Sequence, residues 1–383
     1  MSKKIVILGA GFGGLEAATL LSGKLDDRYE ITMIDKNDSF FIGFSKFDVL
    51  FGRKSEQEIK YNYKDIKAER VNFVKSTIYE IDIDNKTVHI PGKSFSYDYL
   101  IVALGADLNH GAIPGFVESG GYEFYSLEGA KKLNSAINAF ERGTVLINIF
   151  SKPYKCPPAP YEGAFLLHDF FEQKGVREQV TIKMIIPAGM PLPVSKEVSG
   201  EIENLLAERN IELVKSTKIT KIDAANKKAV AEDGAQFEFD LFVGVPVHTP
   251  PKVVKESKLG GDQGFVLASK ENLATRFEGV YAIGDVAKVP VGEAAVPKAG
   301  VFAEDAARTV VADILLKEGV DVSPQKFNAT GACYFEFGGG RVAKVNVNFL
   351  GEEKPKAFLE GLSSDLRTDK QNFQISRKKR WFK

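Results

Sequence analysis

The feature that most constrains this chain is a glycine-rich turn that joins a short apolar strand to a helix near its beginning. Residues 3–8 form a continuous apolar run, which is typical of a buried parallel strand. Gly9, Gly11 and Gly14 follow it in the G-x-G-x-x-G spacing, and a helix is expected over residues 15–24. This strand, turn and helix predict the first unit of a doubly wound α/β fold.

Each glycine has its own reason to be present in a dinucleotide-binding turn. The first makes the tight turn, the second lets the backbone approach a pyrophosphate, and the third allows the helix to pack closely on the strand. A second strand over residues 30–34 ends at Asp35, where a carboxylate can bind ribose hydroxyls. The dinucleotide contacts predicted here are Gly9, Gly11, Phe12, Gly13, Gly14, Asp35 and Lys36.

The composition excludes several other classes of protein. The 51 basic and 51 acidic side chains give no net charge, which argues against a nucleic-acid binder. Two cysteines are too few for a disulfide framework or a Cys-rich metal site, and no metal is predicted. The sequence contains no uncharged apolar run of about 18 residues or more, so no helix is expected to cross a membrane. Because no export signal is recognisable, we expect an intracellular protein.

Two later segments extend the pattern that the glycine turn begins. Residues 97–106 form an apolar strand closing on Ala-x-Gly, and residues 278–286 form another closing on Gly-Asp. In this order, the three motifs resemble the signatures of the two-dinucleotide-binding flavoproteins of the pyridine nucleotide–disulfide oxidoreductase superfamily. The resemblance implies an FAD cofactor, with the Asp285 carboxylate on its ribityl chain. The further FAD contacts that it implies are Ala103, Gly105 and Gly284.

The motifs predict an α/β protein with two Rossmann-like dinucleotide-binding domains and a C-terminal membrane-facing region. The expected divisions are residues 1–108 with 268–325 for FAD, 109–267 for the second Rossmann-like domain, and 326–383 for the C-terminal region. The expected helices cover residues 127–142, 163–173, 196–209 and 303–317, the last of them ending before Gly319. Further strands are expected over residues 144–150 and 180–186.

The second domain lacks a feature that this superfamily normally has. Members that oxidise NADH or NADPH carry a second glycine fingerprint after the first strand of this domain. Here the strand leads into residues 151–163, which contain four prolines. Proline has no backbone N–H and a fixed φ, so such a loop cannot bind a pyrophosphate through backbone donors. The predicted electron donor is therefore not NAD(P)H.

The same loop contains Cys156, at the strand end where ligands bind in such sheets. The other cysteine is Cys333, so the chain has no C-x-x-C dithiol. The Cys-Pro-Pro-Ala-Pro-Tyr-Glu and Thr-Gly-Ala-Cys segments, the Pro-Lys-Ala-Gly step at residues 297–300 and the final Arg-Trp-Phe resemble one branch of the superfamily. That branch comprises the sulfide:quinone oxidoreductases and the flavoprotein subunit of flavocytochrome c sulfide dehydrogenase, and the resemblance covers nearly the whole chain.

This resemblance implies roles for four side chains. Cys156 and Cys333 would form a redox disulfide at the flavin, Glu162 would act as acid and base, and Lys298 would stabilise an anionic reduced flavin. The residues alone also allow inert buried cysteines and an ordinary glutamate at a helix start. The third cysteine of many sulfide:quinone oxidoreductases and the FAD-attaching cysteine of the flavocytochrome branch are absent. Noncovalent FAD is therefore predicted.

The implied reaction is the oxidation of sulfide. Hydrosulfide would attack the disulfide, two electrons would pass through FAD to a membrane quinone, and polysulfide or elemental sulfur would be released. A quinone needs a flat apolar slot. The contacts expected for it are Tyr334, Phe335 and Phe337.

The C-terminal residues predict contact with a membrane surface. Residues 377–383 place five cations around two aromatic side chains, which suits an anionic headgroup layer. An apolar stripe at helical spacing consists of Phe358, Leu359, Leu362 and Leu366. The alternative is a solvated basic end. We expect peripheral attachment at the cytoplasmic face of the membrane, and the formation of homo-oligomers stays open.

Two other functions remain open from the sequence. A protein similar to type II NADH:quinone dehydrogenases is disfavoured by the proline-containing loop. A redox-inactive FAD-binding protein that acts through a partner would leave both cysteines without a role. Among the histidines, His248 follows an apolar strand and is a candidate for a proton path, although a structural role is supported equally well.

Overall fold

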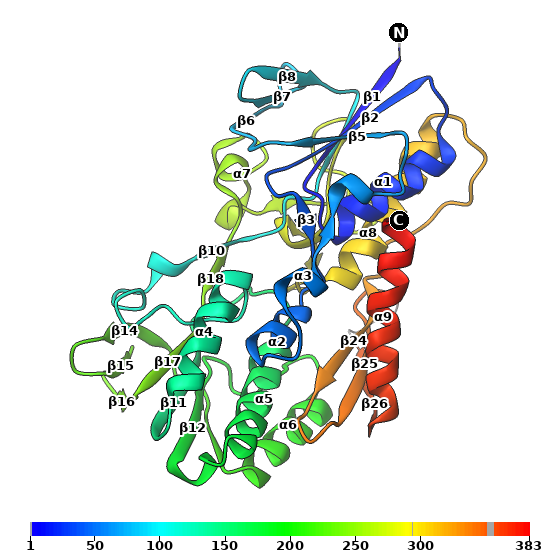
Figure 1. The fold of residues 1–383 in the computed structure, drawn as a ribbon. Coiled ribbons are helices and arrows are strands. Elements are labelled where there is room, and N and C mark those ends of the chain that lie inside the picture. Colours follow the sequence, from blue (N-terminus) through cyan, green and yellow to red (C-terminus); the bar gives the residue numbers. More distant parts are fainter. Residues whose placement is uncertain (1, 293, 351–355) are drawn as a thin grey trace.

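A computed structural model describes residues 2–292, 294–350 and 356–383, and it contains two parallel sheets (Figure 1). The first sheet has, in spatial order, β20 (Val280–Ala282), β9 (Tyr99–Val102), β1 (Lys3–Leu8), β2 (Tyr29–Asp35) and β5 (Val71–Lys75). All four neighbouring pairs are parallel. Residues 280–282 thus complete the sheet that the beginning of the chain starts.

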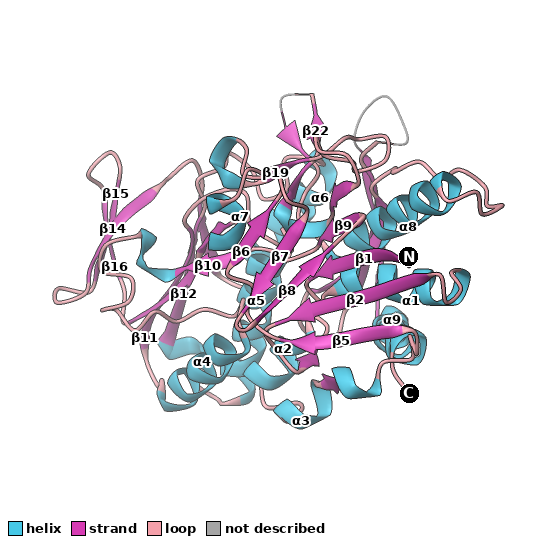
Figure 2. Cartoon of the chain, turned by 90° about the horizontal axis from the view of Figure 1, so that it is seen from above, coloured by secondary structure: helices cyan, strands magenta, loops and turns pink. Residues whose placement is uncertain are grey.

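Two helices pack on each other beside this sheet, α1 (Phe12–Lys24) and α8 (Gly300–Lys317) (Figures 1 and 2). Both begin three residues earlier than predicted, and each includes glycine before its predicted start, Gly13 and Gly14 in α1 and Gly300 in α8. Gly11 is the N-cap residue of α1, so the glycine turn leads directly into its first turn. Gly319, at φ +73°, follows the end of α8 as predicted.

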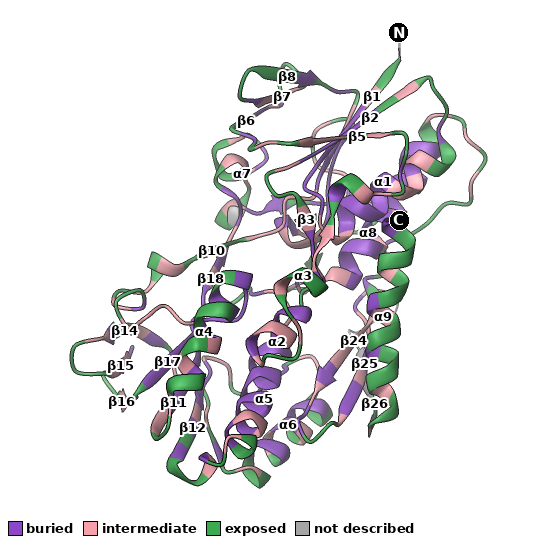
Figure 3. Ribbon diagram, viewed as in Figure 1, coloured by how far each residue is buried: buried purple, intermediate pink, exposed green. Residues whose placement is uncertain are grey.

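The second sheet is parallel as well. Its spatial order is β13 (Ile211–Val214), β12 (Val180–Ile185), β11 (Gly143–Ile149) and β17 (Leu241–Val245). Helix α4 (Leu127–Ala139) precedes β11, α5 (Ala159–Gln173) joins β11 to β12, and α6 (Lys196–Glu208) joins β12 to β13. The predicted alternation of strands and helices is therefore present. Strands of both sheets are largely buried (Figure 3).

Helix α5 begins four residues before the predicted start, within the segment that was expected to be a proline-containing loop. Pro158 is its N-cap residue and Pro160 lies in its first turn. Proline is compatible with these positions because the first N–H groups of a helix have no intrahelical acceptor. The loop proper is therefore shorter than predicted, and Glu162 lies on a helix.

Short elements join and flank the two sheets. β10 (Asp107–Asn109) pairs antiparallel with β18 (Val247–Thr249), and these two strands lie in the segments that connect the two parallel sheets. Antiparallel groups are β6 (Glu80–Asp82), β7 (Thr87–Ile90) and β8 (Lys93–Ser96); β14 (Ile219–Asp223), β15 (Lys228–Ala231) and β16 (Gln236–Glu238); β3 (Ser39–Phe40) with β4 (Tyr61–Asn62); and β22 (Pro290–Val291) with β23 (Ala294–Ala295). The remainder are β19 (Val266–Leu267) with β21 (Ala287–Lys288), α2 (Ser45–Leu50), α3 (Glu56–Ile59) and α7 (Lys252–Glu256).

The apolar helical stripe predicted for the C-terminal region is mostly a strand. It consists of an antiparallel sheet of β24 (Thr330–Glu336), β25 (Val342–Asn348) and β26 (Lys356–Ser363), followed by α9 (Asp365–Trp381). The predicted helical stripe is wrong for Phe358, Leu359 and Leu362, which belong to strand β26. Pairing with β25 sets this conformation, and only Leu366 lies on the helix.

The basic aromatic tail was expected to face a membrane, and the structure instead buries its two aromatic side chains, while Lys378, Lys379, Arg380 and Lys383 stay exposed. The Trp381 side chain is buried, and its Nε1–H donates to Glu16 Oε2 of α1 at 3.0 Å. Arg377 and Arg380 form ion pairs with Glu304 of α8 and Glu16 at 2.9 and 2.6 Å. Phe382 is also buried. These contacts fix α9 against α1 and α8 (Figure 1).

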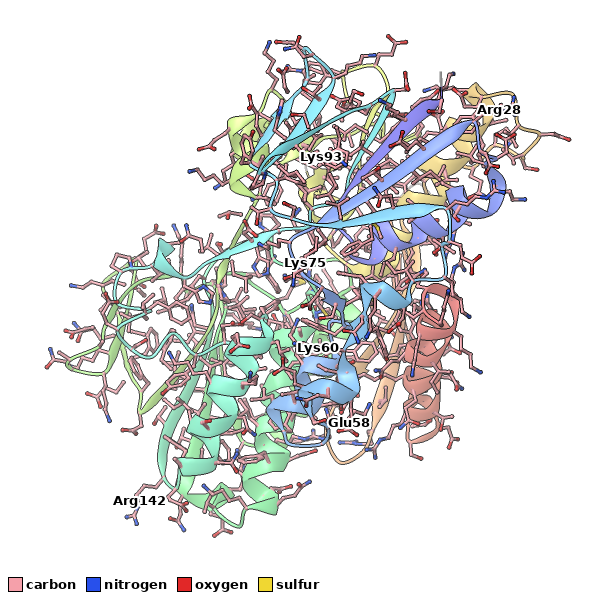
Figure 4. All side chains as sticks on the ribbon, turned by 45° about the horizontal axis from the view of Figure 1, so that its top comes forward. Arg28, Glu58, Lys60, Lys75, Lys93 and Arg142 are labelled. Carbon is pink, nitrogen blue, oxygen red and sulfur yellow. The ribbon has the colours of Figure 1, made fainter. Side chains whose placement is uncertain are left out.

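The surface carries charges of both signs, and Arg28, Lys93 and Arg142 extend outward from separate parts of it (Figure 4). Within the described residues, no helix is both long and apolar enough to cross a membrane.

Candidate active site

A cavity of about 330 Å³ lies where the carboxyl ends of the two parallel sheets meet. Its walls include residues that follow β1, β9 and β20 of the first sheet and β11 of the second. The predicted site residues on its wall are Gly11, Phe12, Gly13, Ala103, Gly105, Cys156, Glu162, Gly284, Asp285, Lys298, Cys333 and Tyr334. The predicted residues away from this wall are Gly9, Gly14, Asp35, Lys36, Phe335 and Phe337.

The glycine turn is shaped by close backbone contacts and leaves open space at one position. A Cβ atom on Gly9, which has φ +94°, would lie 2.4 Å from the Ala103 carbonyl oxygen. A Cβ on Gly14 would lie 1.9 Å from the carbonyl oxygen of Gly9. At Gly11, on the cavity wall, a Cβ would meet nothing within 4 Å. The turn therefore leaves open space beside Gly11 on the cavity wall, where backbone can approach a ligand, and these residues fit a dinucleotide.

Asp35 and Lys36 have other partners in this structure. Asp35 Oδ2 accepts a hydrogen bond from the Ala10 N–H at 2.7 Å, and its Oδ1 accepts one from the Asn37 N–H at 2.8 Å. Lys36 Nζ lies 3.7 Å from Asp107 Oδ1, and both side chains are exposed. The Asp35 carboxylate thus ties the glycine turn to the end of β2, and its contact with a ribose stays a prediction.

Alanine substitutions in α1 and its N-cap separate the two roles of glycine. We expect Gly11→Ala to keep the stability of the protein and to lose most of its FAD, because the added methyl occupies only the space of the ligand. Gly14→Ala should destabilise the fold, because its Cβ collides with backbone. Gly23→Ala, which meets nothing in the same helix, is the control and should gain about 0.5–1 kcal/mol. Flavin content and urea unfolding measure these effects, and full flavin content in Gly11→Ala would contradict the assignment.

The Lys298 side chain binds to the segment that follows β20. Its ammonium donates to the carbonyl oxygen of Asp285 and, at 3.5 Å, to that of Ala287. It lies 3.8 Å from the centroid of the Phe265 ring. Burial lowers the pKa of Lys298 to about 8. The Lys298 carbonyl accepts a hydrogen bond from the Cys156 N–H at 2.8 Å, which joins this segment to the cysteine loop.

The structure brings the two cysteines to one cavity from distant parts of the chain. Cys156 lies between β11 and α5 in a left-handed conformation, φ +53°, and Cys333 lies on β24. Both are partly buried free thiols. Burial raises the pKa of Cys156 to about 12, and Cys333 and Glu162 act in the same direction while Lys46 opposes them. Burial and Glu162 raise the pKa of Cys333 to about 11.

Glu162 belongs to a buried cluster of charges that the sequence did not reveal. Its Oε1 accepts hydrogen bonds from Lys370 Nζ at 2.9 Å and from the Glu336 N–H at 3.2 Å. Lys370 also donates to Glu336 Oε1 at 2.5 Å, and Glu336 pairs with Arg53 at 2.7 Å. Burial, together with Glu336, raises the pKa of Glu162, although Lys370 opposes the shift. Lys370 lies in a polar stretch of α9, where no sequence signal marks it.

Aromatic side chains form another part of the cavity wall. Tyr334 lies at its wall with Phe373 of α9, the two ring centroids 5.9 Å apart, and Phe44 lies 6.0 Å from Phe373. The wall also includes Phe40, Phe41, Phe47 and Phe124. Of this set, Tyr334 is the residue that the sequence predicted as a quinone contact.

Phe335 and Phe337 do not fulfil the expectation that they would line this wall. They are fully buried and stack on each other with ring centroids 4.1 Å apart. Phe165 of α5 packs against both, at 6.1 and 5.3 Å. Side chains alternate between the two faces of β24, so Tyr334 and its neighbour Phe335 point in opposite directions. We do not carry these two phenylalanines forward as ligand contacts.

His248 and His168 differ in their surroundings. His248 is buried, its Nδ1 lies 2.8 Å from the Pro246 carbonyl oxygen, and its Nε2 has no hydrogen-bond partner among the residues that the structure describes. Burial lowers its pKa to about 3, so it is neutral at physiological pH. His168, in α5, lies 3.5 Å from Asp169 and 3.7 Å from Glu172. The potential ligand atoms of these three residues lie within 4.8 Å of one another, a grouping that the sequence prediction did not anticipate.

The cavity joins a dinucleotide-binding turn to a pair of thiols, and this juxtaposition defines the class of flavin-dependent oxidoreductases. Comparison with known families goes one step further. Residues 3–147 and 164–323 match the pyridine nucleotide-disulphide oxidoreductase family, and the chain belongs to that family.

Individual relatives show which members of this family the chain is similar to. A mitochondrial sulfide:quinone oxidoreductase of Dictyostelium discoideum is 26% identical over 306 residues, which are 76% of this chain and 67% of that protein. A type II NADH:quinone oxidoreductase of Staphylococcus saprophyticus is 26% identical over 315 residues, 76% of each chain. The sulfide:quinone oxidoreductase structure from Aquifex aeolicus superposes with a TM-score of 0.87 at 20% identity, covering 98% of this chain and 90% of that one. The predicted resemblance to this branch and the α/β fold are confirmed.

Proposed function

We propose that this protein oxidises sulfide at a Cys156–Cys333 disulfide and passes the electrons through noncovalently bound FAD to a membrane quinone. The carrying observation is that these cysteines, 177 residues apart, line one cavity with the glycine turn. Inert buried thiols would have no reason to meet at a dinucleotide site. The similarity to proteins named sulfide:quinone oxidoreductase supports the same reaction.

The two cysteines account for all the atoms and electrons of the first sulfur product. Hydrosulfide attacks one sulfur of the disulfide, so one cysteine becomes a persulfide and the other a thiolate. A second hydrosulfide attacks the outer persulfide sulfur and leaves as the disulfide anion, HSS⁻. The protein disulfide has then become a dithiol that holds two more electrons. A longer chain needs a second oxidised disulfide, re-formed when the dithiol has passed its electrons on: HSS⁻ attacks that disulfide in place of hydrosulfide, and a further hydrosulfide then displaces the cysteine thiolate to release HSSS⁻.

The protein residues suit noncovalent FAD and its two-electron chemistry. FAD, when bound, supplies transfer of the two electrons from the dithiol to a quinone. Gly11, Gly13 and Asp285 would hold it, and the Lys298 ammonium places a positive charge beside Asp285. Both cysteines are assigned to the sulfur chemistry, so no thiol remains to attach the cofactor covalently.

Glu162 is placed to exchange protons with the thiols inside the cavity. It lines the cavity, and its raised pKa brings protonation closer to neutral pH. Lys370 contacts both Glu162 and Glu336, and Glu336 reaches the half-exposed Arg53. Glu162 would thus accept a proton from a thiol, and the Lys370 ammonium would stabilise this carboxylate whenever it is ionised.

The aromatic part of the wall is our candidate for the quinone site. Tyr334, Phe44 and Phe373 offer flat apolar faces within one cavity. We further propose that the protein docks peripherally on the cytoplasmic face of a membrane, because its quinone substrate resides in the bilayer. The C-terminal aromatics, being buried, are not the anchor that the sequence indicated.

A second candidate function is NADH:quinone oxidation, favoured by the similarity to type II NADH:quinone oxidoreductases. The loop after β11 opposes it, since it carries prolines and Cys156 where a glycine fingerprint would bind NADH. We expect sulfide to support quinone reduction by the FAD-loaded enzyme, and NADH and NADPH to give background rates. Steady-state assays with a short-chain quinone measure all three donors, and rapid reduction by NADH would contradict the proposal.

A further inference from the structure

A buried lysine on the cavity wall has an ammonium group without a charged or hydrogen-bonding partner in the part of the chain that the structure describes. Lys46 lies in α2 with 9% of its surface exposed, and its side chain lines the cavity. The recorded contact of its ammonium is the face of the Phe41 ring, 5.6 Å away. Burying a cation costs free energy unless an anion or hydrogen bonds compensate.

The surrounding charges do not supply that compensation. Lys155, the residue before Cys156, lines the same cavity and also lacks a side-chain partner among the described residues. The carboxylate of Glu162 is occupied by Lys370, and that of Glu123 by Ser126, whose N–H donates to it at 2.9 Å. The other charged groups near Lys46 are Asp285 and, when ionised, Cys156. The cavity wall beside Cys156 therefore presents two lysine side chains, with Asp285 as a nearby acid.

We propose that Lys46 and Lys155 form a binding subsite for small sulfur anions next to Cys156. It would hold hydrosulfide as it approaches and HSS⁻ as it leaves, and it would select anions over neutral sulfur compounds of similar size. Only the identity of the bound anion rests on the proposed function; the presence of an anion subsite does not. Its positive charge also stabilises a Cys156 thiolate, because Lys46 opposes the rise in the pKa of that thiol.

Alkylation with a matched pair of reagents tests the subsite without using sulfide oxidation. Iodoacetate is an anion and iodoacetamide is its neutral counterpart, and both modify the same thiol. In the reduced, FAD-loaded protein we expect Lys46→Met to lower the ratio of iodoacetate to iodoacetamide rates at Cys156 by about tenfold. Lys46→Arg should restore the ratio, and Lys155→Met should lower it less because Lys155 is more exposed. Peptide mass spectrometry assigns the modified cysteine.

Two controls keep the inference separate from folding and from the proposed function. Lys93→Met, on the exposed strand β8, should leave the ratio unchanged (Figure 4). In the wild-type protein, thiocyanate should slow the modification of Cys156 by iodoacetamide. An unchanged ratio in Lys46→Met, loss of its FAD, or no protection by thiocyanate would each overturn the subsite. If the ratio falls but the wild type does not oxidise sulfide, the anion subsite stands and the proposed function fails.

Discussion

Replacing Cys156 by serine should abolish the reduction of bound flavin by sulfide, with a loss of rate on the order of a thousandfold or more. Serine cannot form a disulfide with Cys333, so hydrosulfide has no sulfur to attack. Cys333→Ser should have the same effect, because either change removes the same bond. The two losses should not add in the double variant, since the thiols act as a unit. Anaerobic stopped-flow absorbance at the flavin band measures the rates.

Ala332→Ser is the matched control for these variants. It places a hydroxyl on the same cavity wall without removing a thiol, and it should retain most of the rate. All the variants should contain as much FAD as the wild type, and acid precipitation should release that FAD into solution. Unchanged kinetics in Cys156→Ser would show that the cysteines are bystanders, and flavin that stays with the precipitated protein would contradict noncovalent binding.

The second large effect is expected at Lys370. Lys370→Met should lower the free energy of unfolding by about 3–5 kcal/mol at neutral pH, because it leaves the buried Glu162 carboxylate without a cation and leaves the partly buried Glu336 with Arg53 alone. In the wild type, burial opposes ionisation of Glu336, but Lys370 and Arg53 lower its pKa to about 2. This carboxylate therefore stabilises the fold above its ordinary pKa, and its contribution is lost as the pH falls through the folded value.

The pH dependence identifies the cause of that loss. Without Lys370, the pKa values of both carboxyl groups should rise in the folded state, so the variant takes up protons as the pH falls and recovers stability. The destabilisation measured by urea unfolding should therefore be smaller at pH 5 than at pH 7.5. Lys131→Met is the matched control, because Lys131 also bridges two glutamates, Glu56 and Glu128, but on the exposed surface. It should change stability little. An equal loss at both pH values would contradict the argument.

The parts of the fold that the sequence predicted are those set by local rules. The glycine turn, both parallel sheets and most helices follow from apolar runs and turn residues that lie close together in the chain. The start of α5 was misplaced because prolines were interpreted as loop residues, although Pro158 and Pro160 occupy positions at a helix start that allow proline. Strand β26 was misplaced because its apolar residues fit a helical spacing, whereas pairing with β25 decides their conformation.

The sequence predicted the site residues that belong to recognisable motifs. It missed those that reach the site from distant parts of the chain. Lys370 meets Glu162 across 208 residues, and no spacing rule connects them. The tail was assigned to a membrane because its charges and aromatics were counted without their partners. Glu16, a buried acid in the otherwise apolar helix α1, is the partner of both Trp381 and Arg380. An unexplained acid in an apolar helix was the available signal.

The central claim is that electrons from sulfide reach a quinone through the two thiols and FAD. Anaerobic titration of the FAD-loaded protein with sulfide tests it most directly, followed by addition of a short-chain quinone. The account predicts that sulfide bleaches the flavin absorbance, that the quinone restores it, and that NADH at the same concentration leaves it unchanged. Flavin that stays oxidised with excess sulfide, or that is bleached rapidly by NADH, would contradict the account.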